Sequence, residues 1–272
     1  MSVIWGRLNM HSLKLGLALG SGAARGLAHI GVLKAFEEEG IYPDMVAGTS
    51  AGAMVGALYC AGVDVGSMVQ IAKNIPVKEL FDITVPKVGF IKGNRIEALI
   101  SLLTHDMLIE DLNIPFRAVS TDLASGEKFV FDRGPISRAV RASISIPCIF
   151  VPLYIDDKVL VDGAIMERVP VNTAKDMGAD IVVGVDVGFS APKAKAKNIF
   201  DVIFQTIDTA ERELLKCHAV GADLLIKPYL PNIEPYKFDR IDECFDEGYH
   251  VAKAAIPYIR EVMDSYSSNC CS

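Results

Sequence analysis

The strongest constraint on the fold is the way short apolar stretches alternate with longer helical patterns along the chain. Residues 15–19 and 181–187 are almost uninterruptedly apolar, which is typical of strands buried on both faces of a parallel sheet. Over residues 27–39, apolar side chains recur every three positions and a glycine follows, which predicts a helix with its C-terminal cap. Because alternating strands and helices form parallel sheets covered by helices, we predict a three-layer α/β/α fold with a mainly parallel central sheet.

The other expected elements continue this alternation. We expect strands at 45–47, 116–121, 128–131, 159–161 and 224–227, and helices at 51–61, 95–103, 136–143, 200–219 and 239–263. The stretch 75–111, interrupted by prolines and glycines, fits either a mobile cover over a site or an ordinary connection.

The length of 272 residues and a hydrophobic content of 51% suit one domain with a large core. We expect a leader over residues 1–13, a single α/β domain over 14–263 and a loose tail over 264–272. The apolar run at 15–19 is short for the core of a signal peptide, and no stretch of roughly 20 uncharged apolar residues occurs. We therefore expect no transmembrane segment.

The charge and the cysteines exclude several classes of function. A formal net charge of −7 with scattered basic residues disfavours nucleic-acid binding, whereas a local apolar or basic rim could still dock on a membrane surface. The six cysteines form no Cys-x-x-Cys pair and no histidine pair has metal spacing, so we expect neither a disulfide framework nor a metal site. A reducing compartment fits best, and we expect a cytoplasmic protein, peripheral to a membrane where its substrate requires it.

The segment Gly48-Thr49-Ser50-Ala51-Gly52 is the most informative motif. It matches G-x-S-x-G between an expected strand and an expected helix, where a sharp turn exposes a serine hydroxyl at a helix N-terminus. The plainer interpretation is a serine N-cap beside packing glycines. We favour a nucleophile.

A glycine-rich loop, residues 20–26, follows the first expected strand and opens the first helix. Its backbone amides could hold the pyrophosphate of a dinucleotide or the oxyanion of a tetrahedral intermediate. Strict G-x-G-x-x-G is absent because position 25 is arginine, and the next strand is followed by Ser50 rather than by a ribose-binding acid. We therefore favour an oxyanion hole.

The serine needs a proton acceptor. Of the histidines, only His218 and His250 lie late enough for a Ser–Asp–His triad, and both fall within helical patterns. Asp162 is better placed, because it ends an expected strand and Gly163 and Ala164 leave room for another group to approach. An aspartate that merely caps the next turn remains the alternative.

Together these motifs resemble the patatin-like phospholipase family, in particular its bacterial members. The resemblance covers residues 14–191 and includes the segments 27–33 and 141–147. It implies a patatin-like fold, no metal or other cofactor, and hydrolysis of lipid acyl esters through a Ser50–Asp162 dyad. It further implies an oxyanion hole formed by amides of Gly22, Ala23 and Ala24. The supporting motif residues are Ser21, Arg25, Gly26, Gly48, Gly52, Gly163 and Ala164. Ser21 and Ala23 replace glycines that are usual in the family, and Arg25 would shape the loop.

The resulting hypothesis is an acyl-enzyme on Ser50 that water hydrolyses. Apolar residues over 144–150 and 85–91 are candidates for an acyl-binding wall, with core packing as the alternative. Three other functions stay open: an acyltransferase that uses the same acyl-enzyme, a nicotinamide-dependent oxidoreductase, and a non-catalytic regulator that retains the fold. The residues do not indicate the acyl chain, the head group or the oligomeric state.

Overall fold

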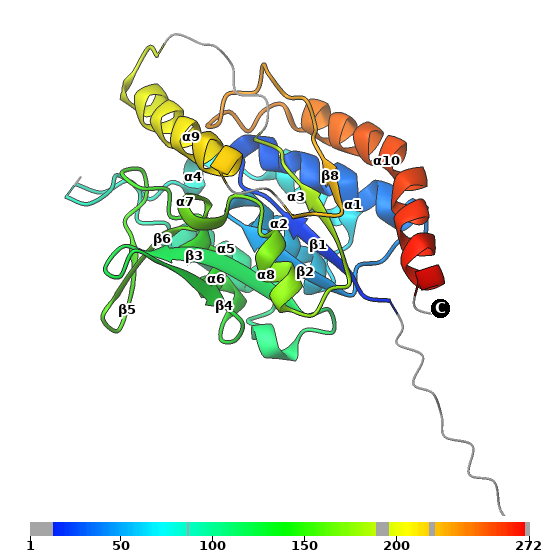
Figure 1. Cartoon of the computed structure of the whole chain (residues 1–272). Helices are drawn as coiled ribbons and strands as arrows, with labels where there is room; N and C mark the ends of the chain where they lie inside the picture. The colour runs from blue at the N-terminus through cyan, green and yellow to red at the C-terminus, as the bar shows by residue number, and fades with distance from the viewer. Residues whose placement is uncertain (1–12, 86, 189–195, 218–220, 270–272) are drawn as a thin grey trace, which may run out of the picture.

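The central feature of the molecule is one mixed β-sheet (Figure 1). The computed structural model describes residues 13–85, 87–188, 196–217 and 221–269, and only the backbone of residues 215–217 and 267–269. Within these residues the sheet has 8 strands in the order β5-β6-β3-β2-β1-β7-β8, and β4 pairs with β3. The strands are β1 Leu15–Leu19, β2 Met45–Thr49, β3 Phe116–Asp122, β4 Glu127–Phe131, β5 Leu153–Ile155, β6 Lys158–Asp162, β7 Ile181–Val185 and β8 Leu224–Ile226.

The middle of the sheet is parallel, and one side of it is antiparallel. Strands β3, β2, β1, β7 and β8 are parallel neighbours, with Leu17 of β1 opposite Val46 of β2 and Val183 of β7. Strands β4, β5 and β6 pair antiparallel. All residues of β1, β2 and β7 are buried, which explains why these strands are apolar without alternation.

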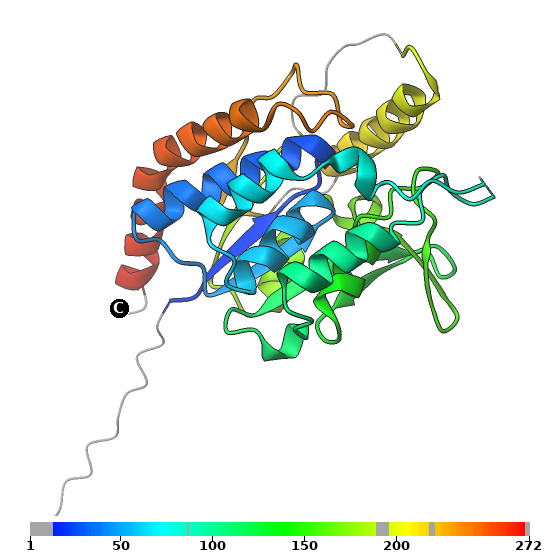
Figure 2. The same ribbon diagram turned by 180° about the vertical axis from the view of Figure 1, so that it is seen from behind.

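Helices cover both faces of this sheet. Helix α8, with α7 beside it, lies on the face seen in Figure 1, whereas Figure 2 shows the blue-to-green helices α1, α2, α3, α5 and α6 on the other. The three-layer α/β/α prediction is therefore confirmed. The helices are α1 Ala28–Glu38, α2 Ala51–Cys60, α3 Val65–Asn74, α4 Val77–Leu80, α5 Asn94–Leu103, α6 Ile136–Ser143, α7 Ala164–Glu167, α8 Val171–Asp176, α9 Ile199–Cys217 and α10 Ile241–Asn269, with 3-10 turns η1 Ala23–Leu27 and η2 Ile109–Asp111.

The predicted strands and helices are all present, with ends shifted by a few residues. The sequence patterns missed β5, α3, α4, α7 and α8, most of which are short and lack a repeated apolar period. Helix α10 runs to Asn269 because no glycine or proline follows Pro257 within it, so residues 264–269 continue the helix instead of forming a loose tail. Residues 1–12 of the expected leader and 270–272 of the tail lie outside the described residues.

The irregular stretch 75–111 forms a folded excursion on the helical side of the molecule. It contains α4, an isolated antiparallel bridge between Ile83 and Ile91, then α5 and η2. The amide of Phe90 donates to the carbonyl of Ile149, and the Asp82 carboxylate accepts from the amides of Gly93 and Asn94 at the start of α5. The first bond ties the middle of the excursion to the segment after α6, and the other two fix the turn that leads into α5.

Candidate active site

Ser50 lies in the turn between β2 and α2 with a backbone that few residues adopt. Its φ of 55° and ψ of −120° lie outside the usual regions for an L-residue. A Cβ at Gly48 would collide with the backbone of Ala53, and a Cβ at Gly52 would collide with the carbonyl of Leu19. Both glycines are therefore required by close backbone approach, as the elbow motif predicts, and the N-cap serine makes no side-chain cap bond.

The geometry that brings Ser50 to Asp162 depends on one edge of β3. Strand β4 pairs with residues 118–122 of β3 and fills one edge, so β2 and β6 must share the other. Strand β2 runs parallel to β3 and ends with Thr49 opposite Val119, whereas β6 runs antiparallel and ends with Asp162 opposite Ser120. The two strands thus meet head to head, and the residues at their ends become neighbours.

This arrangement corrects part of the reasoning that selected Asp162. The sequence pattern placed it at the carboxyl end of a strand in a parallel sheet. In the structure β6 is antiparallel to β3, and Asp162 reaches Ser50 because two opposed strands end at the same point of β3. Short strands carry no sequence signal for their direction, so this could be learned only from the pairing.

Asp162 is buried and has few partners for its charge. Desolvation raises the pKa of its carboxyl to about 6, against the lowering effects of a side-chain hydrogen bond with Ser50 and of the Ala164 amide. The amide of Ala164 donates to Asp162 Oδ1 over 2.9 Å, and a Cβ at Gly163 would collide with the Val119 carbonyl. A carboxylate with a raised pKa beside a serine hydroxyl can act as a general base near neutral pH.

The last residue of α6 and the turn that follows it hold the backbone of both Ser50 and Asp162. The amide of Ser50 donates to Ser143 Oγ over 2.9 Å, and that hydroxyl donates to the carbonyl of Val119 over 2.6 Å. Two residues later, the carbonyl of Ser145 accepts from the amide of Asp162 over 2.9 Å. The resemblance had included this segment without assigning it a role, and no local pattern indicated these contacts.

The glycine-rich loop has most of its amides committed to the fold. The amides of Gly20, Ser21 and Ala24 donate to the carbonyls of Val185, Arg168 and Pro235, and that of Arg25 donates to Gly22. Within the described part of the chain, no acceptor is found for the amides of Gly22 and Ala23. Ala24, predicted as an oxyanion-hole donor, is thus already bonded elsewhere, and Gly22 and Ala23 remain as candidates.

The close packing of this loop also explains its small residues. A Cβ at Gly22 would collide with Val187, and one at Gly26 would collide with Ala51 beside the Ser50 turn. Ala23 replaces a glycine and has a φ of 50°, so the loop keeps a left-handed backbone there. The replacement leaves that conformation intact.

The histidines take no part in this geometry as far as it is described. Buried His29 contacts the carbonyl of Gly20 through Nε2 over 2.8 Å, and burial lowers its pKa to about 4, so it is a neutral brace for the loop. His250 is exposed on α10 beside the ring of Tyr249. His218 lies outside the described residues.

A narrow cavity of about 50 Å³ opens beside the candidate dyad. Asp162, Ser21, Gly22 and Ala23 line it, whereas Ser50, with 3% of its surface exposed, is not among the lining residues. The opposite wall is α9, which contributes Phe204, Ile207, Asp208 and Glu211. Pockets that enclose a drug-sized ligand measure about 300–1,000 Å³, so this one is closed to a lipid as it stands.

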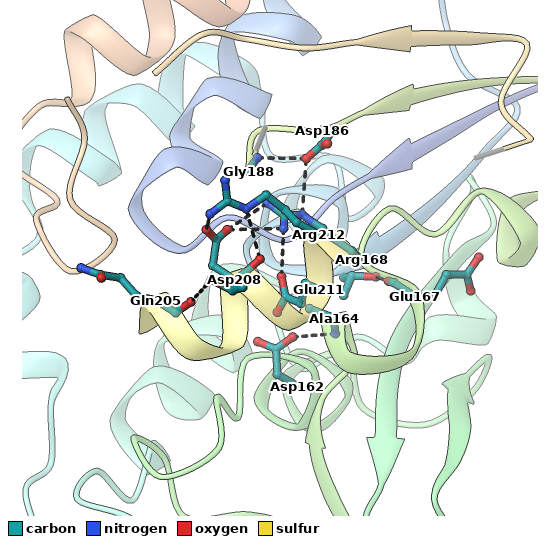
Figure 3. Close-up of polar contacts among 12 residues, drawn as sticks. Asp162, Ala164, Glu167, Arg168, Asp186, Gly188, Gln205, Asp208, Glu211 and Arg212 are labelled. Carbon is teal, nitrogen blue, oxygen red and sulfur yellow. Dashed lines mark hydrogen bonds and ion pairs between the residues drawn. The ribbon is translucent and has the colours of Figure 1, made fainter. Parts of the chain in front are cut away.

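Helix α9 is held over the cavity by buried charges (Figure 3). Arg168, 3% exposed, contacts Asp186 after β7 and reaches Asp208 and Glu211 of α9 at 3.4 Å and 3.3 Å. Burial raises the pKa of the Glu211 carboxyl to about 8, and the nearby Asp162 adds to this effect, whereas Arg168 opposes it. Sequence reasoning missed this cluster because its members come from three distant segments.

Comparison with known proteins identifies the family. The model of the patatin-like phospholipases matches residues 17–175. The chain belongs to the patatin-like phospholipase family. That stretch contains the glycine-rich loop, the Ser50 turn and Asp162, so the family assignment rests on the segments from which the site is built.

Several proteins share this patatin-like region with the chain. It is 36% identical over 182 residues to an uncharacterised NTE family protein of Mycobacterium tuberculosis, covering 66% of this chain and 50% of that one. A lysophospholipase of Aspergillus fumigatus is 36% identical over 180 residues, which cover 64% of this chain and 12% of that one. The chain thus spans about half the length of the mycobacterial relative and far less of the fungal one.

A solved structure extends the likeness beyond the family segment. The crystal structure of VipD from Legionella pneumophila superposes with a TM-score of 0.61 at 12% identity, covering 93% of this chain and 67% of that one. At that identity the likeness concerns the fold. Among the described residues, no helix is long and apolar enough to cross a bilayer, and no group of side chains could hold a metal ion.

Proposed function

We propose that this patatin-like protein is a serine acyl-hydrolase that cleaves carboxylic esters of lipids through Ser50 and Asp162. The observation that supports it most is the convergence of three groups. These are a serine hydroxyl in a strained turn, a buried carboxyl whose pKa that serine side chain lowers, and the backbone amides of Gly22 and Ala23, which line the same cavity as the carboxyl and have no acceptor among the described residues. The family and the lysophospholipase relative support the lipid class of the substrate.

In the first half-reaction, Ser50 Oγ attacks the ester carbonyl carbon while Asp162 accepts the hydroxyl proton. The carbonyl oxygen gains the negative charge, which the amides of Gly22 and Ala23 and the start of α2 stabilise. When the C–O bond to the alcohol breaks, the protonated Asp162 returns the proton to the leaving oxygen. The acyl group then remains on Ser50.

In the second half-reaction, water takes the place of the alcohol. Asp162, again ionised, removes a proton as the water oxygen attacks the acyl carbon, and the same amides hold the oxyanion. Collapse of the intermediate restores the Ser50 hydroxyl with the proton from Asp162 and releases a carboxylic acid. An acceptor alcohol in place of water would make the same intermediate an acyltransferase.

A fluorophosphonate probe with mass-spectrometric mapping tests the nucleophile. We expect the label on Ser50, and we expect Ser50→Ala to lose both the label and hydrolysis of a p-nitrophenyl acyl ester by at least ~1,000-fold. Ser125→Ala, which alters an exposed turn serine bonded to Asp122, is the matched control and should retain both.

The outcome that contradicts the proposal is a folded Ser50→Ala protein with unchanged turnover, or a label on another serine. Product analysis with lysophospholipid, with and without glycerol as acceptor, distinguishes the hydrolase from the acyltransferase. A free fatty acid as the main product in both mixtures supports hydrolysis.

A further inference from the structure

One side of the molecule exposes a group of aliphatic side chains. Ile83, Val85 and Val88 project from the excursion between α4 and α5, and Ile199 and Val202 project from the first turns of α9. Their exposed fractions range from 52% to 80%. Single exposed aliphatic residues are common, but a group on adjoining elements usually marks a binding surface. These five residues are here called the docking face.

The two parts of the docking face belong to one surface. The rings of Phe90 and Phe200 pack with centroids 5.8 Å apart, which joins the excursion to α9 directly. Ile83 pairs with Ile91, and the amide of Thr84 donates to the carbonyl of Phe90, so the excursion folds back on itself with its tip outward. Figures 1 and 2 both place this excursion below the N-terminal end of α9.

These positions are wrong for the acyl-binding wall predicted over residues 85–91. Val85 and Val88 are exposed, and none of the described residues of that stretch, 85 and 87–91, lines the cavity beside Asp162. Ile146 and Pro147, from the second predicted stretch, do line it. The apolar side chains of the docking face therefore do not contact a substrate chain inside the cavity, and we expect a different partner to cover them.

The charges around the docking face favour an anionic partner. Residues 75–95 contain four basic side chains and two acidic ones in a chain whose formal net charge is −7. Lys87 and Lys92 are exposed, whereas the carboxylate of Asp82 is engaged by the amides at the start of α5. Aliphatic side chains flanked by lysines match a lipid surface, where the apolar groups insert and the ammonium groups meet anionic head groups.

The docking face is also connected to the candidate site through α9. The outer side of the first turns of this helix presents Ile199 and Val202, and its inner side presents Phe204 and Ile207 to the cavity. A partner that seats on the outer side therefore lies against the same helix that closes the cavity. A lipid bilayer in that place would bring ester substrate against the helix that covers the cavity.

We propose that the docking face binds the protein to the surface of a lipid bilayer that contains anionic phospholipids. The inference rests on the proposed function, because it names the surface from which the lipid ester is taken. Insertion of aliphatic side chains supplies the affinity, and the lysines bias it toward anionic membranes.

Flotation of the full chain with vesicles tests the proposal. We expect co-flotation with vesicles of phosphatidylcholine and phosphatidylglycerol, and weaker co-flotation with phosphatidylcholine alone. The double variants Val85→Ser/Val88→Ser and Ile199→Ser/Val202→Ser should each reduce partition to the mixed vesicles by about tenfold or more. Lys87→Gln/Lys92→Gln should reduce it by about tenfold and remove the preference for anionic vesicles.

The matched control is Leu102→Ser/Tyr258→Ser, which removes two exposed apolar side chains from α5 and α10 outside the docking face. It should leave vesicle binding within about twofold of the parent. Every variant should retain turnover of a soluble short-chain ester, which shows that the fold and the candidate site are intact.

Three results would overturn the proposal. These are no binding of the parent chain to either vesicle, equal loss in the control, or binding that survives both aliphatic double variants. A dimer of this chain that the same variants disrupt, without vesicle binding, would reassign the surface to contacts between copies. Ser50→Ala should bind vesicles as the parent does and should not hydrolyse ester. In the parent chain, vesicle binding without hydrolysis would refute the proposed function alone, and hydrolysis without vesicle binding would refute the docking face alone.

Discussion

At the scale of single residues, the candidate site depends on a strained backbone that its neighbours must hold. A residue in a sparsely populated φ/ψ region costs about 1–3 kcal/mol and persists only where contacts fix it. Ser50 has such a backbone, and its amide is fixed by the hydroxyl of Ser143, which is itself tied to Val119 of β3. Ser143 is thus a positioning residue for the proposed nucleophile.

We predict that Ser143→Ala lowers kcat by about tenfold or more with little change in KM. The change leaves the buried Ser50 amide without an acceptor, which costs about 1–3 kcal/mol, and displaces the hydroxyl from Asp162. Ser143→Cys keeps the size of the side chain and a weak acceptor, so its kcat should lie between those of the parent and of Ser143→Ala. Steady-state kinetics on a soluble ester measure both parameters.

The matched control is Ser145→Ala, which removes another buried hydroxyl two residues away, one that bonds Arg141 rather than Ser50. It should lose stability to a similar degree but little kcat. Equal kinetic loss in both variants would contradict a positioning role for Ser143.

The buried Asp162 carboxyl is expected to lower the free energy of unfolding at the pH at which it acts as a base. Its pKa of about 6 in the folded chain exceeds the ordinary value of 3.8, so the folded state prefers the neutral form. This preference favours folding below about pH 4 and is lost as the pH rises through about 6. Above pH 6 the folded chain carries a buried charge that the unfolded chain does not have to bury.

Asp162→Asn should therefore abolish hydrolysis and yet stabilise the protein at pH 8, by an amount on the order of 3 kcal/mol. The gain should disappear below about pH 4, where both states of the parent are protonated. Denaturant unfolding at pH 4 and pH 8 measures the difference. In the parent chain kcat/KM should rise with pH around 6. The account would be refuted if the stability difference between Asp162→Asn and the parent were smaller at pH 8 than at pH 4.

At the scale of elements, helix α9 covers the cavity beside Asp162. Its inner side closes the cavity, and the buried guanidinium of Arg168 ties its Asp208 and Glu211 to Asp186 after β7. Removal of one partner of a buried ion pair leaves uncompensated charge, which costs about 3–5 kcal/mol. The ion pairs of Arg168 with Asp186 and Asp208, and its contact with Glu211, are therefore expected to hold α9 in place over the cavity.

We predict that Arg168→Gln increases hydrogen exchange in α9 far more than in α10. The control is Arg212→Gln, which removes the partner of Asp208 that lies in the same helix and is partly exposed, and should change exchange only slightly. Hydrogen-exchange mass spectrometry of peptides covering residues 199–217 and 241–269 gives both readouts. Uniform loosening of the whole chain, or equal effects of the two variants, would show that Arg168 does not act as a specific tie for α9.

The contrast between α9 and the Ser50 turn shows what the sequence could predict. The turn and the glycine-rich loop were predictable because their chemistry lies within a few consecutive residues, where glycines report close backbone approach. Other features depend on contacts between segments far apart in the chain. They are the juxtaposed ends of β2 and β6, the hydrogen bond of Ser143 to Ser50, and the Arg168 cluster. The same limit explains why residues 85–91 were assigned to the cavity: an apolar pattern indicates contact with something apolar, but not which side of the molecule it faces.

At the scale of the whole molecule, the first and last helices of the described chain, α1 and α10, pack against each other. Helix α10 packs along α1, and this contact passes over Gly248 of α10, where a Cβ would overlap the backbone of Ala28. The family segment ends at residue 175, yet β7 pairs with β1 in the middle of the sheet and α10 covers α1. We infer that the segments beyond the family match are needed for the domain to fold.

Gly248→Ala tests the α1–α10 contact, because helix propensity and steric overlap change the free energy of unfolding in opposite directions. Alanine gains about 1 kcal/mol over glycine inside a helix, whereas insertion of a methyl group against backbone costs about 1–3 kcal/mol. Since the backbone of Ala28 cannot yield as a side chain could, we expect a net loss of unfolding free energy and a lower midpoint for the whole transition. Gly66→Ala in α3 is the matched control, because its Cβ would approach only the side-chain carboxylate of Asp64, at 3.1 Å, and no backbone, and it should gain stability. Urea unfolding measures the free energy of unfolding of both variants. A loss for Gly248→Ala together with a gain for Gly66→Ala would show that the close α1–α10 contact stabilises the whole domain. A gain for both variants would show that this contact can loosen without loss of stability.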